Sequence, residues 1–322
     1  MKRVLVTGID GHLGTRAAQL LEQRDDVEAI VGCDFMPPRR RLRRAIFKRI
    51  EPRDRDRLVT FVTEFAPTAV VHFGVYEPAA RMGLHRAQVS TEACTVAALG
   101  AAARTGMLEH IVLRSGLEVY GRGRGTPLTP DEDAPLDPTS PYGMSLLEVE
   151  TTAAGIARRH DVRVASLRFA PVSGSHAPSP LGRLLRLPLV PVPAFVDPPF
   201  QLLDTEDAAR AAVEALVRGA HGPYNVVGPG AASPWQAVRL GGRVPLPVSG
   251  PGWLLARRLS EVAGAPIPPH TLALMRQGLT ADGGHATSAL GLGAMVPTQV
   301  VLDDLFEWAT VTPIARAERR VA

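Results

Sequence analysis

Apolar residues in the first half of the chain fall into short, nearly continuous runs, and the segments between these runs carry apolar residues at helical spacing. Short runs rich in Val, Ile and Leu are typical of strands buried on both faces of a parallel sheet. The expected strands are 2–6, 29–33, 68–73, 110–113 and 162–169, and the expected helices are 12–23, 56–64, 88–104 and 141–159. This alternation predicts the α/β class, with a doubly wound parallel sheet covered by helices on both faces.

The first expected strand leads into the sequence TGIDGHLG, a glycine-rich turn that opens a helix. Gly8 permits a tight turn, Gly11 lets a diphosphate approach the backbone, and Gly14 lets the helix pack closely on the strand. The free N–H groups at the start of the helix, around His12 and Leu13, would then point at a pyrophosphate. With a strand before it and a helix after it, the turn predicts a dinucleotide-binding site.

An acidic residue decides which dinucleotide we expect. Asp34 ends the second strand, where a carboxylate accepts hydrogen bonds from the adenosine ribose and repels a 2′-phosphate, so it favours NAD over NADP. The loop that follows carries five arginines, Arg39, Arg40, Arg41, Arg43 and Arg44. We favour a solvated basic loop over a site for a 2′-phosphate, and we expect NAD.

The pattern changes after residue 174. Seven prolines between residues 178 and 199 would disrupt a core strand or helix, so we expect neither there. A helix is expected at 203–217, capped by Asp204 or Thr205, then a strand at 224–227 and short helices at 254–263 and 300–309. We therefore expect a Rossmann-type NAD-binding domain at 1–174, to which 200–230 returns, a smaller, interrupted C-terminal cap at 175–199 and 231–312, and a flexible tail at 313–322. A small-molecule substrate would bind in the cleft between the domains.

Composition narrows the class of protein. The 322 residues are 45% hydrophobic, enough for one large α/β domain or two smaller ones. No apolar run reaches the roughly 18 residues that span a bilayer, and the first strand leaves no room for a signal peptide, so we expect a cytoplasmic protein without a membrane partner. Cys33 and Cys94 are expected to be reduced core thiols. The small net charge of +4 and the lack of finger or metal-ligand spacing argue against nucleic acid and metal binding.

Several segments together resemble one protein family. The sequences TGIDGHLG, VVHFG, SGLEVYG, SPYGMSLLEVE, LRFAPVSG and LLDTEDAARA, together with Asp34, follow the order and spacing of extended short-chain dehydrogenases/reductases. More narrowly, the chain resembles the NAD-dependent epimerase/dehydratase family, which includes nucleotide-sugar 4-epimerases and 4,6-dehydratases. The resemblance implies further cofactor contacts from Ile50, Phe73, Gly74 and Tyr142. It also implies a homodimer formed through the helices at 88–104 and 141–159.

The catalytic residues of that family are only partly present. Its chemistry uses a Ser or Thr, a Tyr, and a Lys four residues after the Tyr. The Tyr and the Lys share one face of a helix, where the ammonium group lowers the pKa of the phenol. Tyr142 is retained, but Leu146 stands at the lysine position and Gly116 at the hydroxyl position, with Ser115 one place early. The asparagine that the family commonly carries after its sixth strand is Pro171 here. Losing the standard acid–base arrangement costs about 10²–10⁴ in rate.

Other polar residues are weaker candidates. Glu118 aligns with the glutamate of the dehydratase Asp–Glu pair, whose aspartate is replaced by Leu117. We interpret His72 as a core histidine beneath the cofactor. Arg81 and His85 follow the strand at 68–73, where relatives contact substrate, and their alternative is that they are exposed loop residues. His176 follows the sixth strand and faces the cleft, and its alternative is a structural or solvent-exposed role.

Three functions stay open at this point. The first is an NAD-dependent epimerase/dehydratase-like oxidoreductase that acts on a sugar-like or secondary-metabolite alcohol, with Tyr142 as the acid and base and Ser115 as a helper. The second is a non-redox lyase or cyclase that uses Tyr142 and Glu118. The third is an NAD-binding pseudoenzyme, a sensor or assembly partner, because an intact cofactor turn stands beside an incomplete catalytic face.

Overall fold

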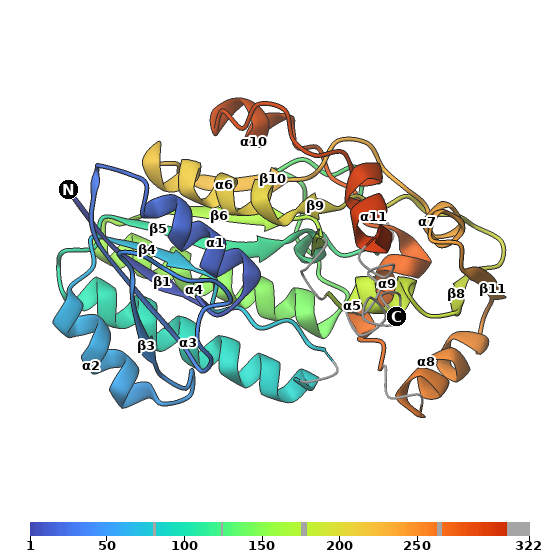
Figure 1. Ribbon diagram of the computed structural model, residues 1–322, viewed down its shortest axis with the longest axis horizontal. Coiled ribbons are helices and arrows are strands. Elements are labelled where there is room, and N and C mark those ends of the chain that lie inside the picture. The colour runs from blue at the N-terminus through green and yellow to red at the C-terminus, as the bar shows by residue number, and fades with distance from the viewer. Residues whose placement is uncertain (80–81, 124, 175–178, 263–265, 308–322) are drawn as a thin grey trace, which may run out of the picture.

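The computed structural model describes residues 1–79, 82–123, 125–174, 179–262 and 266–307. Its centre is a seven-stranded sheet in the order β10-β6-β5-β4-β1-β2-β3 (Figure 1). The strands are β1 (Lys2–Thr7), β2 (Val27–Asp34), β3 (Ile46–Arg49), β4 (Ala69–His72), β5 (His110–Gly116), β6 (Arg163–Phe169) and β10 (Gly222–Val226). Every neighbouring pair is parallel. The predicted doubly wound α/β fold is therefore confirmed.

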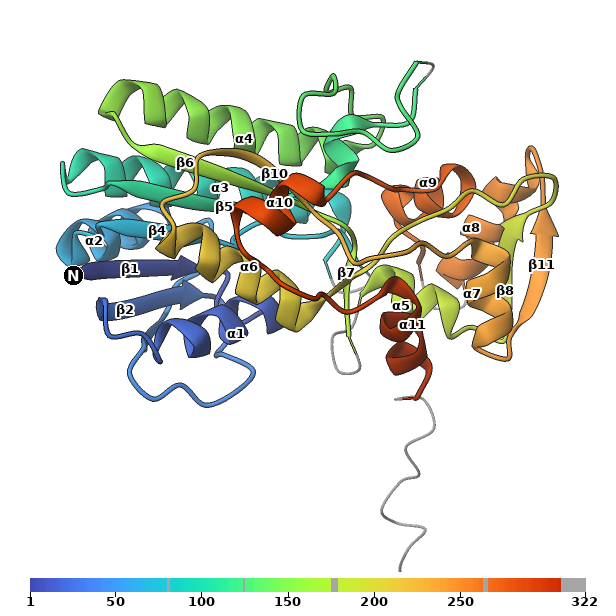
Figure 2. The same ribbon diagram turned by 90° about the horizontal axis from the view of Figure 1, so that it is seen from above.

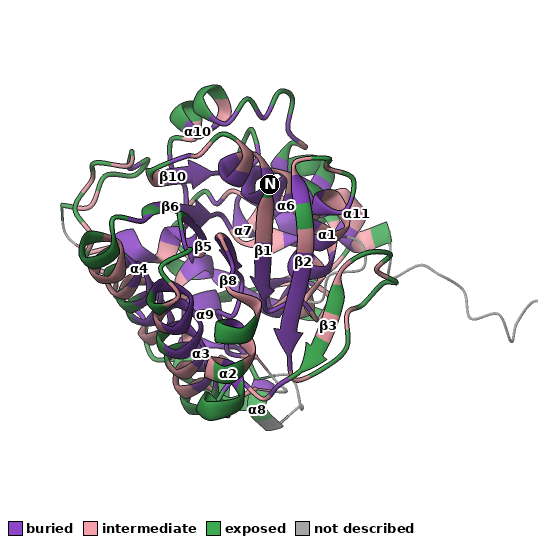
Figure 3. Cartoon of the chain, turned by 90° about the vertical axis from the view of Figure 1, so that its left-hand side faces the viewer, coloured by how far each residue is buried: buried purple, intermediate pink, exposed green. Residues whose placement is uncertain are grey.

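Helices cover both faces of this sheet, as Figures 2 and 3 show. One face carries α2 (Arg55–Phe65), α3 (Leu84–Arg104) and α4 (Pro141–His160), and the other carries α1 (His12–Leu21) and α6 (Thr205–Val217). The strands and the inner helix faces form one buried core (Figure 3). Alanines on α3 allow it to pack closely, and Ala97, Ala98, Ala101 and Ala102 are all buried within the single chain. No helix in the described ranges combines the length and the apolar character needed to cross a bilayer.

The order of the strands creates a crevice at one edge of the sheet. From β1 the chain builds outward to β2 and β3, then returns to β4 on the other side of β1. Where a parallel sheet reverses direction in this way, the carboxyl ends of the strands leave a crevice that binds ligands. The loops after β1 and β4 therefore lie on either side of the expected cofactor site.

The proline-rich segment contains regular structure, so the expectation of none there is wrong. It forms α5 (Pro180–Leu185) and β8 (Leu189–Pro193), and β8 pairs in parallel with β11 (Val244–Val248) in a separate two-stranded sheet. Prolines alternate with other residues in both strands, so the N–H groups that face the partner strand are retained. For example, the amide of Ala194, just after β8, donates to the Val248 carbonyl at 3.1 Å. Proline is tolerated where its missing N–H would face away from a partner strand.

The rest of the C-terminal region is largely helical. Near β8 and β11 lie α7 (Pro234–Leu240), α8 (Gly252–Val262) and α9 (Pro269–Gln277), at the right of Figure 1. The short pair β7 (Val172–Ser173) and β9 (Leu203–Asp204) and the helix α11 (Thr298–Glu307) join this region to the sheet. In contrast, α10 (Gly284–Ala289) packs on β10, where the rings of Tyr224 and His285 stack 5.1 Å apart. The predicted tail at 313–322 lies outside the described residues.

A buried polar network fastens α4 to the sheet. Arg168 on β6 and Glu150 on α4 form a two-pronged ion pair, with Nη2 2.9 Å from Oε2 and Nε 3.1 Å from Oε1. Arg168 also donates to the Tyr120 hydroxyl at 2.9 Å, and Tyr120 donates to Asn225 on β10 at 2.7 Å. A buried ion pair is stable only where its other polar atoms also find partners, and each side-chain nitrogen of Arg168 and each carboxyl oxygen of Glu150 has at least one.

We expect Glu150→Ala to lower the free energy of unfolding by about 3–5 kcal/mol, because it leaves the buried Arg168 charge without a partner. Glu214→Ala is the matched control, since Glu214 forms an exposed i,i+4 pair with Arg218, and such pairs contribute only about 0.3–0.5 kcal/mol. Urea denaturation followed by circular dichroism measures both losses. Equal losses in the two variants would contradict the role of the network.

Candidate functional site

A groove runs along the carboxyl edge of the sheet. Its lining includes the glycine turn, Asp34 at one end and Arg114 at the other. Helix α1 begins in this groove with no side-chain cap and no acidic residue in its first turn. Bare helix N-termini bind phosphate groups, so the residues present fit the diphosphate of a dinucleotide. Gly8, Gly11, His12, Leu13, Gly14 and Phe73 all line the groove.

Two glycines in the turn are required by close packing. Gly8 has a φ of +69°, and a Cβ there would overlap the carbonyl of Phe73 in the loop after β4. A Cβ at Gly14 would overlap the carbonyl of Gly8, so α1 could not approach β1. A Cβ at Gly11 would contact only the Gly8 carbonyl oxygen, at 3.5 Å, so the space around Gly11 is otherwise open.

The adenosine end of the groove is marked by a buried carboxylate. Asp34 accepts hydrogen bonds from the Phe35 amide at 2.8 Å, the Tyr76 hydroxyl at 3.2 Å and the Asp10 amide at 3.4 Å. Burial, followed by the charge of Asp10, raises the pKa of Asp34 to about 8. Ribose hydroxyls can form hydrogen bonds with this carboxyl group, whereas a 2′-phosphate would lie beside two acidic side chains, Asp34 and Asp10. Arg39 reaches over the turn and donates to the Asp10 carbonyl at 3.2 Å.

Two predicted cofactor residues lie beneath the groove. Ile50 is buried, and its amide donates to the Asp34 carbonyl at 2.9 Å. The Gly74 amide donates to the Thr7 hydroxyl at 3.1 Å. His72 is fully buried between Thr7 and Thr95, and burial lowers its pKa to about 4, so it is the neutral core histidine that we expected.

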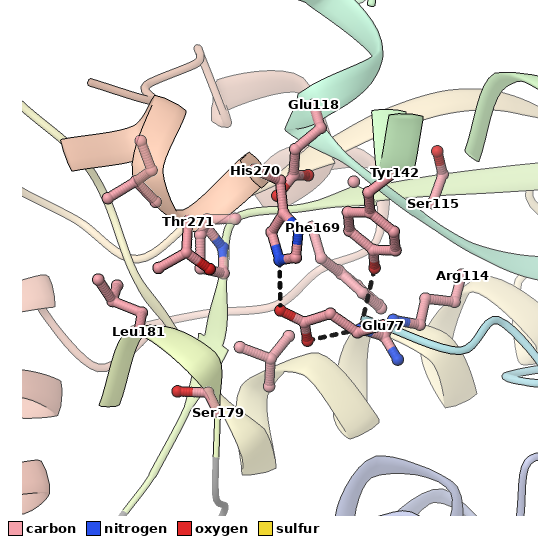
Figure 4. A pocket seen from close by; sticks show the side chains of 15 residues that line it. Glu77, Arg114, Ser115, Glu118, Tyr142, Phe169, Ser179, Leu181, His270 and Thr271 are labelled. Atoms are coloured by element: carbon pink, nitrogen blue, oxygen red, sulfur yellow. Dashed lines mark hydrogen bonds and ion pairs between the residues drawn. The ribbon is translucent and has the colours of Figure 1, made fainter. Parts of the chain in front are cut away.

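Beyond the Arg114 end of the groove, a second pocket brings together five ionisable side chains from different parts of the chain (Figure 4). Glu77 comes from the loop after β4, Arg114 from β5, Glu118 from the turn after β5, Tyr142 from the first turn of α4, and His270 from α9 in the C-terminal region. The carboxyl ends of neighbouring parallel strands converge at one edge, which explains why Glu77 and Arg114 meet.

Hydrogen bonds and ion pairs connect four of these side chains in series. His270 Nε2 lies 3.0 Å from Glu77 Oε1, Glu77 Oε2 lies 3.8 Å from Arg114 Nη2, and Arg114 Nη2 donates to the Tyr142 hydroxyl at 3.4 Å. The rings of Tyr142 and His270 are also in contact, with their centroids 4.7 Å apart. The Tyr142 phenol is therefore held beside a guanidinium instead of an ammonium.

Burial sets the protonation states in this pocket. Burial raises the pKa of the Tyr142 phenol above its ordinary value, although the nearby Arg114 charge lowers it. Burial also raises the pKa of Glu118. For Glu77 burial acts in the same direction, but the hydrogen bond and charge of His270, followed by the charge of Arg114, lower its pKa overall. Tyr142 therefore remains a neutral phenol around pH 7, while Glu77 is an anion.

The positions of the missing family residues are filled by other groups. Leu146 is completely buried, and its Cδ1 would lie 3.1 Å from a Cβ built on Gly116. The same Cβ would lie 2.5 Å from Glu118 Oε2, so the Glu118 carboxylate occupies the space into which a side chain at position 116 would project. Ser115 lines the pocket, but its hydroxyl donates to Glu150 at 2.5 Å, so the structure does not place it on Tyr142 as the expected helper.

Sequence comparison identifies the family. The model of the NAD-dependent epimerase/dehydratase family matches residues 4–227. The chain belongs to this family. Membership also confirms NAD as the cofactor.

Other members show how far the similarity extends. An uncharacterised protein of Mycobacterium tuberculosis is 28% identical over 99% of this chain and 87% of its own. The UDP-glucose 4-epimerase of Azospirillum brasilense is 30% identical, over 56% of this chain and 51% of its own. Among solved structures, UDP-glucose 4-epimerase from Brucella ovis in complex with NAD superposes with a TM-score of 0.71 at 21% identity, covering 95% of this chain and 96% of the other. That similarity shows a shared fold.

Sequence reasoning missed three residues of this epimerase/dehydratase pocket, Glu77, Arg114 and His270. Glu77 and Arg114 carried a signal, because both stand at the carboxyl ends of expected strands, where ligand-binding residues gather. His270 carried none, because its segment has no family motif. Of the weaker candidates, His85 is exposed in the first turn of α3. Arg81 and His176 lie outside the described residues.

We expect Asp34→Asn to change how the stability of the NAD-free protein depends on pH. A carboxyl whose pKa rises from 3.8 unfolded to about 8 folded adds stability below pH 4 that is lost as the pH rises towards 8. The melting temperature of wild type should therefore fall, relative to that of the variant, between pH 4 and pH 8. Asp25→Asn, at an exposed position, is the control, and curves for wild type and Asp34→Asn that stay parallel would contradict the shift.

Proposed function

We propose that this protein is an NAD-dependent oxidoreductase of the epimerase/dehydratase type that acts on a secondary alcohol of a sugar-like substrate. NAD, when bound, accepts a hydride and can return it. The chain must then move the hydroxyl proton, position the alcohol carbon and exclude water. The observation that supports this proposal is the hydrogen bond from Arg114 to the phenol of Tyr142.

Arg114 supplies the positive charge that Leu146 cannot. In the family pattern the cation stands on the same helix as the tyrosine, four residues later. Here it comes from β5, and Glu77 and the Val75 carbonyl, 3.3 Å from Nη1, hold it against the phenol. A guanidinium cannot lose its own proton near neutral pH, so it stabilises a phenolate without competing for the proton.

Tyr142 would act as the proton-transfer residue. Arg114 donates to its oxygen, which leaves the phenol O–H free to point at a substrate oxygen. As a neutral acid it can protonate an oxygen that gains negative charge, and as the pH rises its phenolate can remove the hydroxyl proton. Because burial raises its pKa, the oxidation direction should become faster as the pH rises above neutrality.

The pocket lining suits a partly polar small molecule. Phe169, Leu181 and Leu274 provide apolar walls, while Ser179 and Thr271 offer hydroxyls. Several structural relatives were solved with UDP-sugars, among them UDP-glucuronic acid 4-epimerase from Bacillus cereus. UDP-sugars are therefore the first substrates to test, with secondary-metabolite alcohols next.

A second candidate, water elimination, is favoured by the position of Glu118. Its carboxylate stands over Gly116 beside the pocket, and burial raises its pKa, so it can deliver a proton to a leaving hydroxyl. The third possibility, an NAD-binding protein without turnover, is supported by the buried Leu146. Turnover of any alcohol that depends on Tyr142 would exclude this last possibility.

We expect Tyr142→Phe to reduce the NAD-dependent oxidation of a responding UDP-sugar by about 10²–10⁴-fold, since it removes the transferable proton. Arg114→Met should reduce it by about 10–100-fold, because a charged hydrogen bond contributes about 1.5–3 kcal/mol. NADH absorbance at 340 nm measures the rate, and Arg114→Lys should recover part of it.

Arg159→Met, on the exposed end of α4, is the matched arginine control and should leave the rate unchanged. NAD affinity, measured by calorimetry, shows whether each variant keeps the cofactor groove. An oxidation rate that is the same in wild type and Tyr142→Phe would refute the role of the phenol.

We also propose that two copies of the chain form a homodimer through α3 and α4. The two helices pack side by side, and Val96 on α3 and Met144 on α4 are exposed apolar residues. Val96→Glu should convert the dimer into a monomer in light scattering coupled to size-exclusion chromatography, because it would bury a charge in the interface. Met107→Glu, an exposed site beyond the end of α3, is the control. A wild-type monomer at all concentrations would disprove the dimer.

A further inference from the structure

Two residues that are far apart in the sequence form a buried carboxylate–imidazole pair in the pocket. Glu77 follows β4 in the large sheet, and His270 stands in the first turn of α9, 193 residues later. Nε2 of the imidazole lies 3.0 Å from Glu77 Oε1, and the His270 side chain is only 5% exposed. The pair exists only because α9 packs over the loop after β4, so the N-terminal and C-terminal parts of the chain each contribute one member.

The carboxylate fixes which imidazole nitrogen carries the proton. An anionic Glu77 can only accept, so in the neutral imidazole of His270 Nε2 is the N–H nitrogen and Nδ1 carries the lone pair. Nδ1 is buried and has no hydrogen-bond partner among the described residues. A buried polar atom without a partner costs stability and is found where a ligand or a reaction uses it. Glu77 thus orients His270 as a hydrogen-bond acceptor in the pocket.

Figure 4 shows what surrounds this imidazole. The ring lies between the carboxyl groups of Glu118 and Glu77 and beside the ring of Tyr142. Arg114 contacts the other carboxyl oxygen of Glu77, with Nη2 3.8 Å from Oε2. Tyr142 and His270 both line this pocket, and their rings are in contact. A substrate whose alcohol binds the phenol would therefore lie beside the imidazole.

We propose that His270, oriented by Glu77, is a second proton-transfer residue that removes a proton from the carbon next to the oxidised alcohol carbon. This inference rests on the proposed function, in which that alcohol becomes a carbonyl. A carbonyl makes the neighbouring C–H acidic. The C–H bond breaks as Nδ1 gains the proton, and the electron pair forms a C=C bond while the carbonyl oxygen takes the negative charge. Arg114 and the Tyr142 phenol stabilise that oxygen.

The proposal restricts the substrate class. The substrate must carry a hydrogen on a carbon adjacent to the reacting alcohol, as sugars and other polyols do. Return of a proton from His270 to the same carbon restores the ketone, with solvent hydrogen in place of the original one. Exchange of that hydrogen is therefore the chemical signature of the imidazole, separate from the redox step.

The test is deuterium exchange into a ketone that is supplied ready-made. The NAD-loaded full chain is incubated in D₂O with UDP-4-keto-pentose, and mass spectrometry follows incorporation next to the carbonyl. We expect His270→Gln to slow the catalysed exchange by at least about 100-fold. His160→Gln, an exposed histidine at the end of α4, should exchange like wild type. Wild-type exchange that is absent, or equal to that of His270→Gln, overturns the proposal.

The same experiment separates this inference from the proposed function. If UDP-sugars are oxidised but the ketone does not exchange, the redox function holds and His270 is not the base. If the ketone exchanges through His270 but no alcohol is oxidised, the base holds and the redox function fails. NAD affinity of His270→Gln within about twofold of wild type shows that this variant is folded and keeps its cofactor groove.

A spectroscopic readout tests the positioning role of Glu77 without turnover. In ¹⁵N-labelled protein, the neutral imidazole of wild-type His270 should carry its proton on Nε2 and leave Nδ1 unprotonated. Glu77→Gln should remove this preference, because an amide can donate as well as accept. A wild-type signal with the proton on Nδ1 would leave no base facing the pocket and would overturn the proposal.

Discussion

The close contact between the turn after β1 and the loop after β4 is the constraint on which the rest of the site depends. Because residue 8 has no side chain, the turn can rest directly on the Phe73 carbonyl. This contact holds the start of α1 on one side of the crevice and residues 75–77 on the other. The anion-binding helix terminus and the Glu77 carboxylate are thereby fixed within a single groove. A bulkier turn would separate the cofactor site from the polar pocket.

The pocket keeps the charge pattern of its family but takes the charges from different elements. A lysine on α4 and a hydroxyl at position 116 would share one corner, and here Leu146 and Gly116 fill that corner without charge or polarity. The cation comes from β5 and the carboxylate over Gly116 comes from the turn that follows. A buried phenol needs a nearby positive charge to ionise at an accessible pH, and that requirement does not depend on which element supplies it.

Local pattern was sufficient to predict the sheet, its helices and the cofactor turn, because each depends on residues close together in the sequence. The apolar runs gave β1, β2, β4, β5, β6 and β10, and the glycine spacing gave the groove. The edge strand β3 escaped prediction because its residues IFKR are largely exposed. The pair of Glu77 and His270 could not be predicted, since it depends on how α9 packs against α4 and β8. Ser115 was misjudged because its partner Glu150 lies on another element.

The proline pattern of the small sheet also affects how molecules of this protein meet one another. A two-stranded sheet has two open edges, and β8 and β11 expose apolar side chains such as Leu189, Val244 and Leu246. Such edges normally recruit further strands from neighbouring molecules. Here Pro191, Pro193, Pro245 and Pro247 remove the amide donors from the outward sides. This small sheet can thus display an apolar surface at high protein concentration without starting edge-to-edge aggregation.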